Sequence, residues 1–275
     1  VSGDFRSHSV AYFLEPILEH HDKTQFEIFC YAAMDNPDSM TARMAALVDH
    51  WRYISAMTDE QLSSRIEEDG VEILVDLSGH TAHNRLPAFA RRMAPVQISW
   101  LGYPNTTGLD TIDFRFTDAI ADPPGSEAHH SEQLFRLSGG FLCYRAPEDA
   151  PLVAPAPFIK NQHITFGSFN NAAKITPQVI KTWSSILQNT PNSRLYLKAR
   201  PFADDDVCSD FLDQFSRHGI DKSRLELTGR TESIADHLSR YCEIDIALDT
   251  FPYNGTTTTC EAMWMGVPTV TLCAN

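Results

Sequence analysis

Residues 244–261 read IDIALDTFPYNGTTTTCE. The apolar beginning is typical of a buried strand, and Gly255 then permits a tight turn close to a ligand. Four threonines follow, where a helix over Thr257–Met265 is expected to begin. The free N–H groups and positive dipole of a helix start suit an anion, so the threonines favour a diphosphate site. Ordinary N-capping by one threonine is the alternative. Glu261, one turn into the helix, is placed to accept a ribose hydroxyl.

The same alternation of a short apolar run and a helical run recurs along the chain. Strands are expected at Phe26–Tyr31, Val71–Leu77, Val96–Gly102, Phe114–Thr117, Ile164–Phe169, Arg194–Lys198, Leu225–Leu227, Ile244–Leu248 and Thr269–Cys273. Helices are expected at Thr176–Leu187, Asp204–Arg217, Ser233–Tyr241 and Thr257–Met265. Few hairpin signals separate these runs, so the pattern predicts an α/β fold with parallel sheets covered on both faces.

Four prolines at positions 147, 151, 155 and 157 mark the strongest break in the chain. They predict a semi-rigid connector over residues 147–159, between an N-terminal domain of residues 1–146 and a C-terminal domain of residues 160–275. Ligands of such sheets bind outside the carboxyl ends of the strands, often in a cleft between domains. The sequence starts VSGD without a methionine and stops just after an expected strand. We therefore expect a fragment whose C-terminal domain is incomplete.

Composition excludes several classes of function. With 22 basic and 36 acidic residues among 275, the net charge is −14, which disfavours nonspecific binding to nucleic acid or to an anionic membrane. No run of about 18 apolar residues predicts a membrane span. The six cysteines are scattered without a CxxC pair, which favours a reducing, cytoplasmic setting over a disulfide framework.

Two further segments follow expected strands. In FGSFNNAAKITP, residues 166–177, Lys174 lies between a strand and a helix that starts at Pro177, so its ammonium is expected at the strand's carboxyl end. The alternative is a solvated surface lysine. In WLGYPNTTG, residues 100–108, glycine and proline predict a rigid turn whose backbone donors hold a polar ring, or a turn with no such role.

The histidines give weaker signals. His8 is able to accept a proton near neutral pH, although a lone histidine is more often an ordinary surface or core residue. His80 and His83 have HxxH spacing without a third ligand, so no metal site is predicted. His237, on an expected helix, is a candidate to stack on a nucleobase.

Taken in order, SGDFxxH at the start, LGYP, FNNxxK and the threonine segment resemble glycosyltransferase family 41 over essentially the whole chain. That family comprises protein O-GlcNAc transferases and the plant SPINDLY protein O-fucosyltransferases. The resemblance implies a GT-B fold, in which two Rossmann-like domains face a cleft and the nucleotide sugar is held mostly by the C-terminal domain. The long insertion of animal members, which would fall near residues 147–157, is absent.

The resemblance also implies roles for residues around the donor diphosphate. Lys174 is similar to the lysine that neutralises the diphosphate, and Asn171 to its neighbouring amide contact. Thr257 and Thr258 match phosphate-binding hydroxyls. Two further positions depart from animal members: Thr256 stands where these have histidine, and Tyr253 replaces a cysteine beside the phosphates.

Other positions match contacts to the base, the ribose, the sugar and the acceptor. His237 matches a histidine that packs on the nucleobase, with Arg240 near it, and Glu261 replaces a ribose-binding aspartate. The wall beside the sugar is matched by Leu101, Gly102 and Pro104. His8 matches a histidine proposed near the acceptor, whose role as a base is disputed in the family.

The implied activity is an inverting transfer of GlcNAc from UDP-GlcNAc to Ser or Thr hydroxyls of proteins, without a metal or other cofactor. The residues at the motif positions resemble SPINDLY more than animal members, so protein O-fucosylation from GDP-fucose is an alternative. A non-catalytic nucleotide-sugar-binding fragment and a glycan-modifying enzyme or epimerase are others. A protein acceptor and upstream tetratricopeptide repeats are the implied partners.

Overall fold

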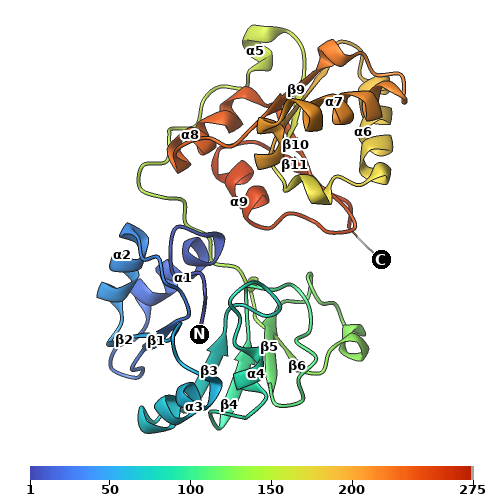
Figure 1. Ribbon diagram of the computed structural model, residues 1–275. Helices are drawn as coiled ribbons and strands as arrows, with labels where there is room; N and C mark the ends of the chain where they lie inside the picture. Colours follow the sequence, from blue (N-terminus) through green and yellow to red (C-terminus); the bar gives the residue numbers. More distant parts are fainter. Residues whose placement is uncertain (274–275) are drawn as a thin grey trace. The chain divides into compact units, whose positions relative to one another are not determined.

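The computed structural model describes residues 1–273, which form two compact α/β units (Figure 1). The first unit ends at Arg145, one residue before the predicted boundary, and the second begins at Ala146. The predicted linker of residues 147–159 therefore counts with the second unit. Its last residues begin helix α5 (Phe158–Asn161), whose first backbone N–H donates to the Asp245 carboxylate at 2.8 Å.

The first unit contains only parallel strands among its described residues. Its strands are β1 (Phe29–Ala32), β2 (His50–Tyr53), β3 (Ile73–Asp76), β4 (Val96–Ser99), β5 (Phe114–Thr117) and β6 (Gln133–Arg136). β3, β4, β5 and β6 form one sheet in that order, and β1 pairs with β2. Residues 1 and 2 connect the two sheets, because Val1 bonds the backbone of Val75 and Leu77 while Ser2 bridges to Ala32.

Strands β2 and β6 were not predicted from the sequence. Both lie at the edge of a sheet, and one residue of the eight is buried, so neither has a continuous apolar run. The helices of this unit were not predicted either: α1 (Ser9–His20), α2 (Ser39–Leu47), α3 (Asp59–Glu68), α4 (Leu86–Phe89) and the 3-10 turn η1 (Ser126–His129). β1 lies later than the predicted 26–31, since Phe26 is 55% exposed.

The second unit has one parallel sheet in the order β11-β10-β7-β8-β9. Its strands are β7 (Thr165–Ser168), β8 (Arg194–Lys198), β9 (Leu225–Thr228), β10 (Ile246–Leu248) and β11 (Thr269–Val270). The chain runs from β7 outward to β9 and then returns to add β10 and β11 on the other side. β7 and β10 are therefore neighbours at the point where the strand order reverses, which is where ligands bind in open α/β sheets.

Helices cover this sheet as the sequence predicts. They are α6 (Pro177–Asn189), α7 (Asp205–Ser216), α8 (Ile234–Ser239) and α9 (Thr257–Trp264), with 3-10 turns η2 (Ala172–Lys174), η3 (Arg200–Ala203), η4 (Lys222–Arg224) and η5 (Arg240–Glu243). α6, α7 and α8 are capped by Thr176, Asp204 and Ser233, the first residues of the predicted ranges. Within residues 1–273 no helix has the length and apolar character needed to cross a membrane.

Candidate functional site

The two segments singled out in the C-terminal half follow β7 and β10, so the reversal of strand order brings them together. Lys174, after β7, donates from Nζ to the Asn254 carbonyl at 2.9 Å. The same nitrogen lies 3.9 Å from the centre of the Tyr253 ring, within cation–π range. Burial lowers the pKa of Lys174, and the Asp249 carboxylate partly opposes that shift. Lys174 is thus half-buried and held against the loop before α9, unlike a solvated surface lysine.

Asp249 organises that loop. Its buried carboxylate, directly after β10, accepts hydrogen bonds from the backbone N–H groups of Thr250 at 2.8 Å and Gly255 at 2.7 Å. Asn170, also buried, donates to it at 3.3 Å and accepts from the Thr258 hydroxyl at 3.1 Å. A Cβ atom on Gly255 would lie 2.5 Å from the Thr258 hydroxyl oxygen, so this position requires glycine.

The start of α9 presents donors that the helix itself does not use. The first hydrogen bond within the helix runs from the Cys260 N–H to the Thr256 carbonyl, which leaves the N–H groups of residues 257–259 ahead of it. Thr256 precedes the helix without a capping hydrogen bond from its side chain. The alternative of ordinary N-capping by Thr256 is therefore wrong. Thr258 binds Asn170, and Thr259 contacts the Gly255 carbonyl at 3.4 Å.

His237 and Glu261, predicted separately, are hydrogen-bonded to one another. His237 Nε2 lies 2.9 Å from Glu261 Oε2, and the opposite nitrogen, Nδ1, lies 2.8 Å from the Lys198 ammonium. The Tyr241 hydroxyl also donates to Glu261 Oε2, at 3.0 Å. Glu261 is 4% exposed, and its other oxygen, Oε1, is left as an acceptor among the described residues. Rings of Phe169 and Tyr241 border the imidazole at 5.9 and 5.7 Å.

Two residues predicted to contact the nucleotide-sugar donor, Arg240 and Asn171, make local interactions in the structure. Arg240 forms an ion pair with Glu243 at 2.8 Å on an exposed face. Its charge still acts on Lys198, whose pKa it helps to lower after the larger effect of burial. The Asn171 side chain accepts from the Ala173 N–H at 3.1 Å and caps η2, so its amide nitrogen is the atom available to a ligand.

In the first unit, the LGYP turn follows the carboxyl end of β4. Leu101 has a positive φ of 69°, and a Cβ on Gly102 would lie 1.8 Å from the Leu77 carbonyl oxygen, so only glycine fits. Pro104 is exposed. Arg115, 3% exposed on β5, holds the turn by donating to the carbonyls of Tyr103 at 2.9 Å and of Asn105 at 3.1 Å.

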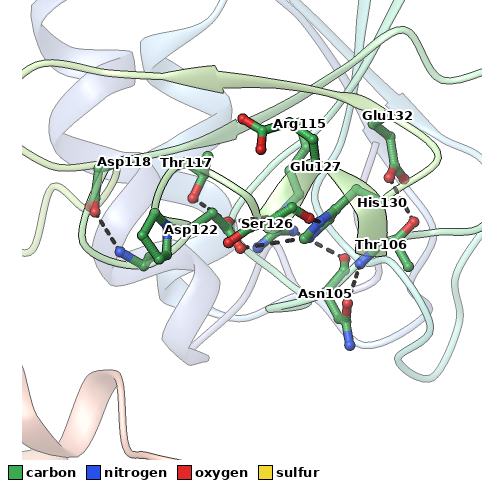
Figure 2. Close-up of polar contacts among 12 residues, drawn as sticks. Asn105, Thr106, Arg115, Thr117, Asp118, Asp122, Ser126, Glu127, His130 and Glu132 are labelled. Carbon is green, nitrogen blue, oxygen red and sulfur yellow. Dashed lines mark hydrogen bonds and ion pairs between the residues drawn. The ribbon is translucent and has the colours of Figure 1, made fainter. Parts of the chain in front are cut away.

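Further polar contacts support the segment after this turn (Figure 2). Buried Glu132 accepts from the Thr106 hydroxyl and the Thr107 N–H, each at 2.7 Å. Asp122 faces Arg115 Nε at 3.5 Å and accepts from the Thr117 hydroxyl. A charged network of this kind, absent from the sequence predictions, fixes the loop that carries the predicted sugar-side wall.

His8 is the N-cap residue of α1 and lies just before its first residue, Ser9. Its Nδ1 accepts from the Val10 N–H at 3.3 Å and lies 3.8 Å from Asp4 Oδ2. Burial lowers the pKa of His8, so the neutral ring is favoured at pH 7. Since Nδ1 accepts a hydrogen bond, the hydrogen of the neutral ring is on Nε2. In this geometry His8 offers a hydrogen-bond donor through Nε2, and accepting a proton requires the capping bond to break.

Two other features of the described residues lie apart from these groups. A hollow of about 780 Å³ is lined by the amino ends of β7, β8 and β9, at the opposite end of the sheet from Lys174. No predicted site residue lines this hollow. We therefore place the candidate site at the carboxyl ends of the strands, where the charged and donor groups lie, and not in the hollow. Among residues 1–273, no group of three or more His, Cys, Asp or Glu side chains is arranged to hold a metal ion.

Comparisons with known proteins identify the family of the chain. The family model described as "Glycosyl transferase family 41" matches residues 1–144 and 155–275. The chain is 48% identical over 99% of its length to a Solanum lycopersicum protein named "Probable UDP-N-acetylglucosamine--peptide N-acetylglucosaminyltransferase SPINDLY". It spans 30% of that relative's length.

Two solved structures extend the comparison to the fold. A mutant of the Thermobaculum terrenum O-GlcNAc transferase superimposes with a TM-score of 0.95 at 43% identity, covering 99% of this chain and 52% of that one. The lipopolysaccharide outer core galactosyltransferase WaaB, in its apo form, superimposes with a TM-score of 0.59 at 13% identity, covering 98% and 77%. The predicted α/β fold of the GT-B class is confirmed.

Proposed function

Because the chain belongs to glycosyl transferase family 41, we propose that it transfers GlcNAc from UDP-GlcNAc to Ser or Thr hydroxyls of a protein acceptor. One observation carries the proposal: Lys174 and the start of α9 lie together where the order of parallel strands reverses. An ammonium and free backbone N–H groups at that point suit a diphosphate.

The reaction we propose is an inverting displacement. The acceptor oxygen bonds to the anomeric carbon as the bond from that carbon to the diphosphate breaks, and the acceptor hydroxyl loses its proton. Negative charge then grows on the leaving diphosphate, where Lys174 and the N–H groups of residues 257–259 would stabilise it. In this proposal Thr256, Thr257, Tyr253 and the Asn171 amide complete the diphosphate subsite, and no metal or other cofactor takes part.

The remaining groups of the second unit would hold the nucleoside. In the proposal the exposed part of the His237 ring stacks on the base, with Arg240 beside it. Glu261 Oε1 accepts a ribose hydroxyl, because Oε2 is already engaged by His237 and Tyr241. On the first unit, Leu101, Gly102 and Pro104 would form the wall beside the sugar, and His8 would act on the acceptor side.

The second candidate donor is GDP-fucose, because the residues of the motifs resemble the plant SPINDLY protein O-fucosyltransferases. The SPINDLY relative with 48% identity is itself named as a UDP-N-acetylglucosamine–peptide N-acetylglucosaminyltransferase. The six cysteines are scattered along the sequence without a CxxC pair, which fits a reducing, cytoplasmic setting. We include that setting in the proposal, together with tetratricopeptide repeats upstream.

Calorimetric titration with UDP-GlcNAc and GDP-fucose, each with and without EDTA, tests the proposal. Tight UDP-GlcNAc binding that EDTA leaves unchanged, followed by transfer to a protein substrate, is the expected result. Preference for GDP-fucose would make the chain a protein O-fucosyltransferase. If neither donor binds, the proposed activity is wrong. Binding without transfer would leave a nucleotide-sugar-binding protein.

A further inference from the structure

Lys198 is a buried lysine that the proposed reaction does not use. It is the last residue of β8, is 5% exposed, and follows Leu195, Tyr196 and Leu197, which are 0–2% exposed. Taking an ammonium out of water is costly unless hydrogen bonds and an opposite charge compensate it. Burial lowers the pKa of Lys198, and Glu261 opposes that shift. A lysine kept at this position therefore needs acceptors.

The described residues supply Lys198 with one acceptor. An ammonium has three N–H donors and no acceptor. One donor is used by His237 Nδ1 at 2.8 Å, and the nearest aromatic face, that of Phe169, has its centre 5.9 Å from Nζ. Two donors of a buried cation thus remain for a ligand beside the imidazole.

The bond to Lys198 also decides the protonation of His237. Because the ammonium only donates, His237 Nδ1 must accept, so the ring hydrogen is on Nε2 and is donated to Glu261 Oε2 at 2.9 Å. The positive charge of Lys198 and the negative charge of Glu261 then flank a neutral ring. Both edges of the imidazole are fixed, and its side chain is 17% exposed.

We propose that Lys198 reads the base of the nucleotide, donating a hydrogen bond to a ring carbonyl oxygen while it fixes the tautomer of His237. The inference rests on the proposed function, since it requires a nucleoside diphosphate at the carboxyl ends of β7 and β10. The ligand class is a nucleotide whose base carries a ring carbonyl. Uracil has two ring carbonyls, guanine has one and adenine has none, so Lys198 favours UDP and GDP over ADP.

Binding of UDP, GDP and ADP to Lys198→Met tests this inference. The variant keeps the length of the side chain and removes its donors. We expect binding of the preferred carbonyl-bearing nucleotide to weaken about 10–100-fold and ADP binding to stay the same, because a hydrogen bond from a charged donor is lost. The KM for the donor sugar nucleotide should rise while kcat stays within a few-fold. Lys181→Met, on the exposed face of α6, is the matched control.

Nitrogen-15 NMR of His237 gives a readout that a purely structural role would not move. In the unaltered protein at pH 8, Nε2 should carry the hydrogen and Nδ1 should not, and Lys198→Met should lose this fixed pattern. Equal weakening for all three nucleotides, no weakening, or a hydrogen on Nδ1 in the unaltered protein would overturn the role of Lys198. Failure of the unaltered protein to bind any of the three would instead refute the proposed function, and this inference with it.

Discussion

Replacing Lys174 by methionine removes the charge that we place beside the leaving diphosphate. Two unit charges about 4 Å apart interact by about 4 kcal/mol at an effective dielectric constant of about 20. Partial solvent access reduces this value, and loss of one preorganised donor typically costs about 10²–10³ in kcat. We therefore expect kcat of Lys174→Met to fall about 10²–10³-fold. Donor affinity should fall much less, because the N–H groups at the start of α9 remain.

The assay is single-turnover release of nucleoside diphosphate at saturating donor, with donor affinity measured by calorimetry and Lys181→Met as the control. Since burial lowers the pKa of Lys174, the folded protein disfavours the charged lysine, and the nucleotide-free variant should unfold at no lower temperature than the unaltered protein. An unchanged unfolding temperature would exclude misfolding as the cause of a slow reaction. A Lys174→Met variant with donor bound and near-normal kcat would refute the role of this residue.

Three further predictions address charge, the turn and backbone packing. The charge of Lys174 is lost as pH rises through its lowered pKa, so kcat/KM should decline at a pH below lysine's ordinary 10.5, and Lys174→Arg should shift that decline to higher pH. Asp249→Asn should weaken nucleotide binding at least ten-fold by calorimetry, whereas Asp245→Asn, at the other end of β10, should lower unfolding stability and spare binding. Gly102→Ala should lower the free energy of unfolding, measured by urea denaturation, by more than about 3 kcal/mol, because the new Cβ would meet a backbone carbonyl. Gly108 has a positive φ and open space around it, so Gly108→Ala should lower that free energy by only about 1–2 kcal/mol.

The sequence predicts the second unit better than the first, and the reason lies in burial. All residues of β7 and four of the five in β8 are buried, so the small and apolar residues of ITFGSF and the LYL of RLYLK mark both strands. The helices that follow begin at recognisable caps. In the first unit, α3 is capped by Thr58 and buries two residues, Leu62 and Ile66, among charged neighbours. Such a narrow apolar stripe is hard to separate from a solvated segment without knowing what packs on it.

The candidate site is also only partly predictable from the sequence. Lys174 and the threonines are recognisable because each follows a buried strand within a few residues, and the carboxyl ends of adjacent parallel strands meet. Which strands are adjacent is not written locally: the pairing of β7 with β10 joins Phe166 to Ile246, 80 residues later in the chain. Local spacing therefore gave the members of the diphosphate subsite separately, and strand order assembled them.

The nucleoside subsite as a whole could not be predicted from the spacing of residues in the sequence. Lys198, His237 and Glu261 come from β8, α8 and α9, and each has an ordinary local interpretation as a strand end, a helical histidine or a helical acid. The role of these three residues depends on the direction of their hydrogen bonds. Because the Lys198 ammonium only donates, His237 Nδ1 must accept, and the hydrogen on Nε2 is donated to the Glu261 carboxylate. A charged residue that ends an apolar strand such as RLYLK is the one sequence signal that could have pointed to Lys198. The same reasoning applies to Asp249, which directly follows the apolar strand β10 and organises the turn before α9.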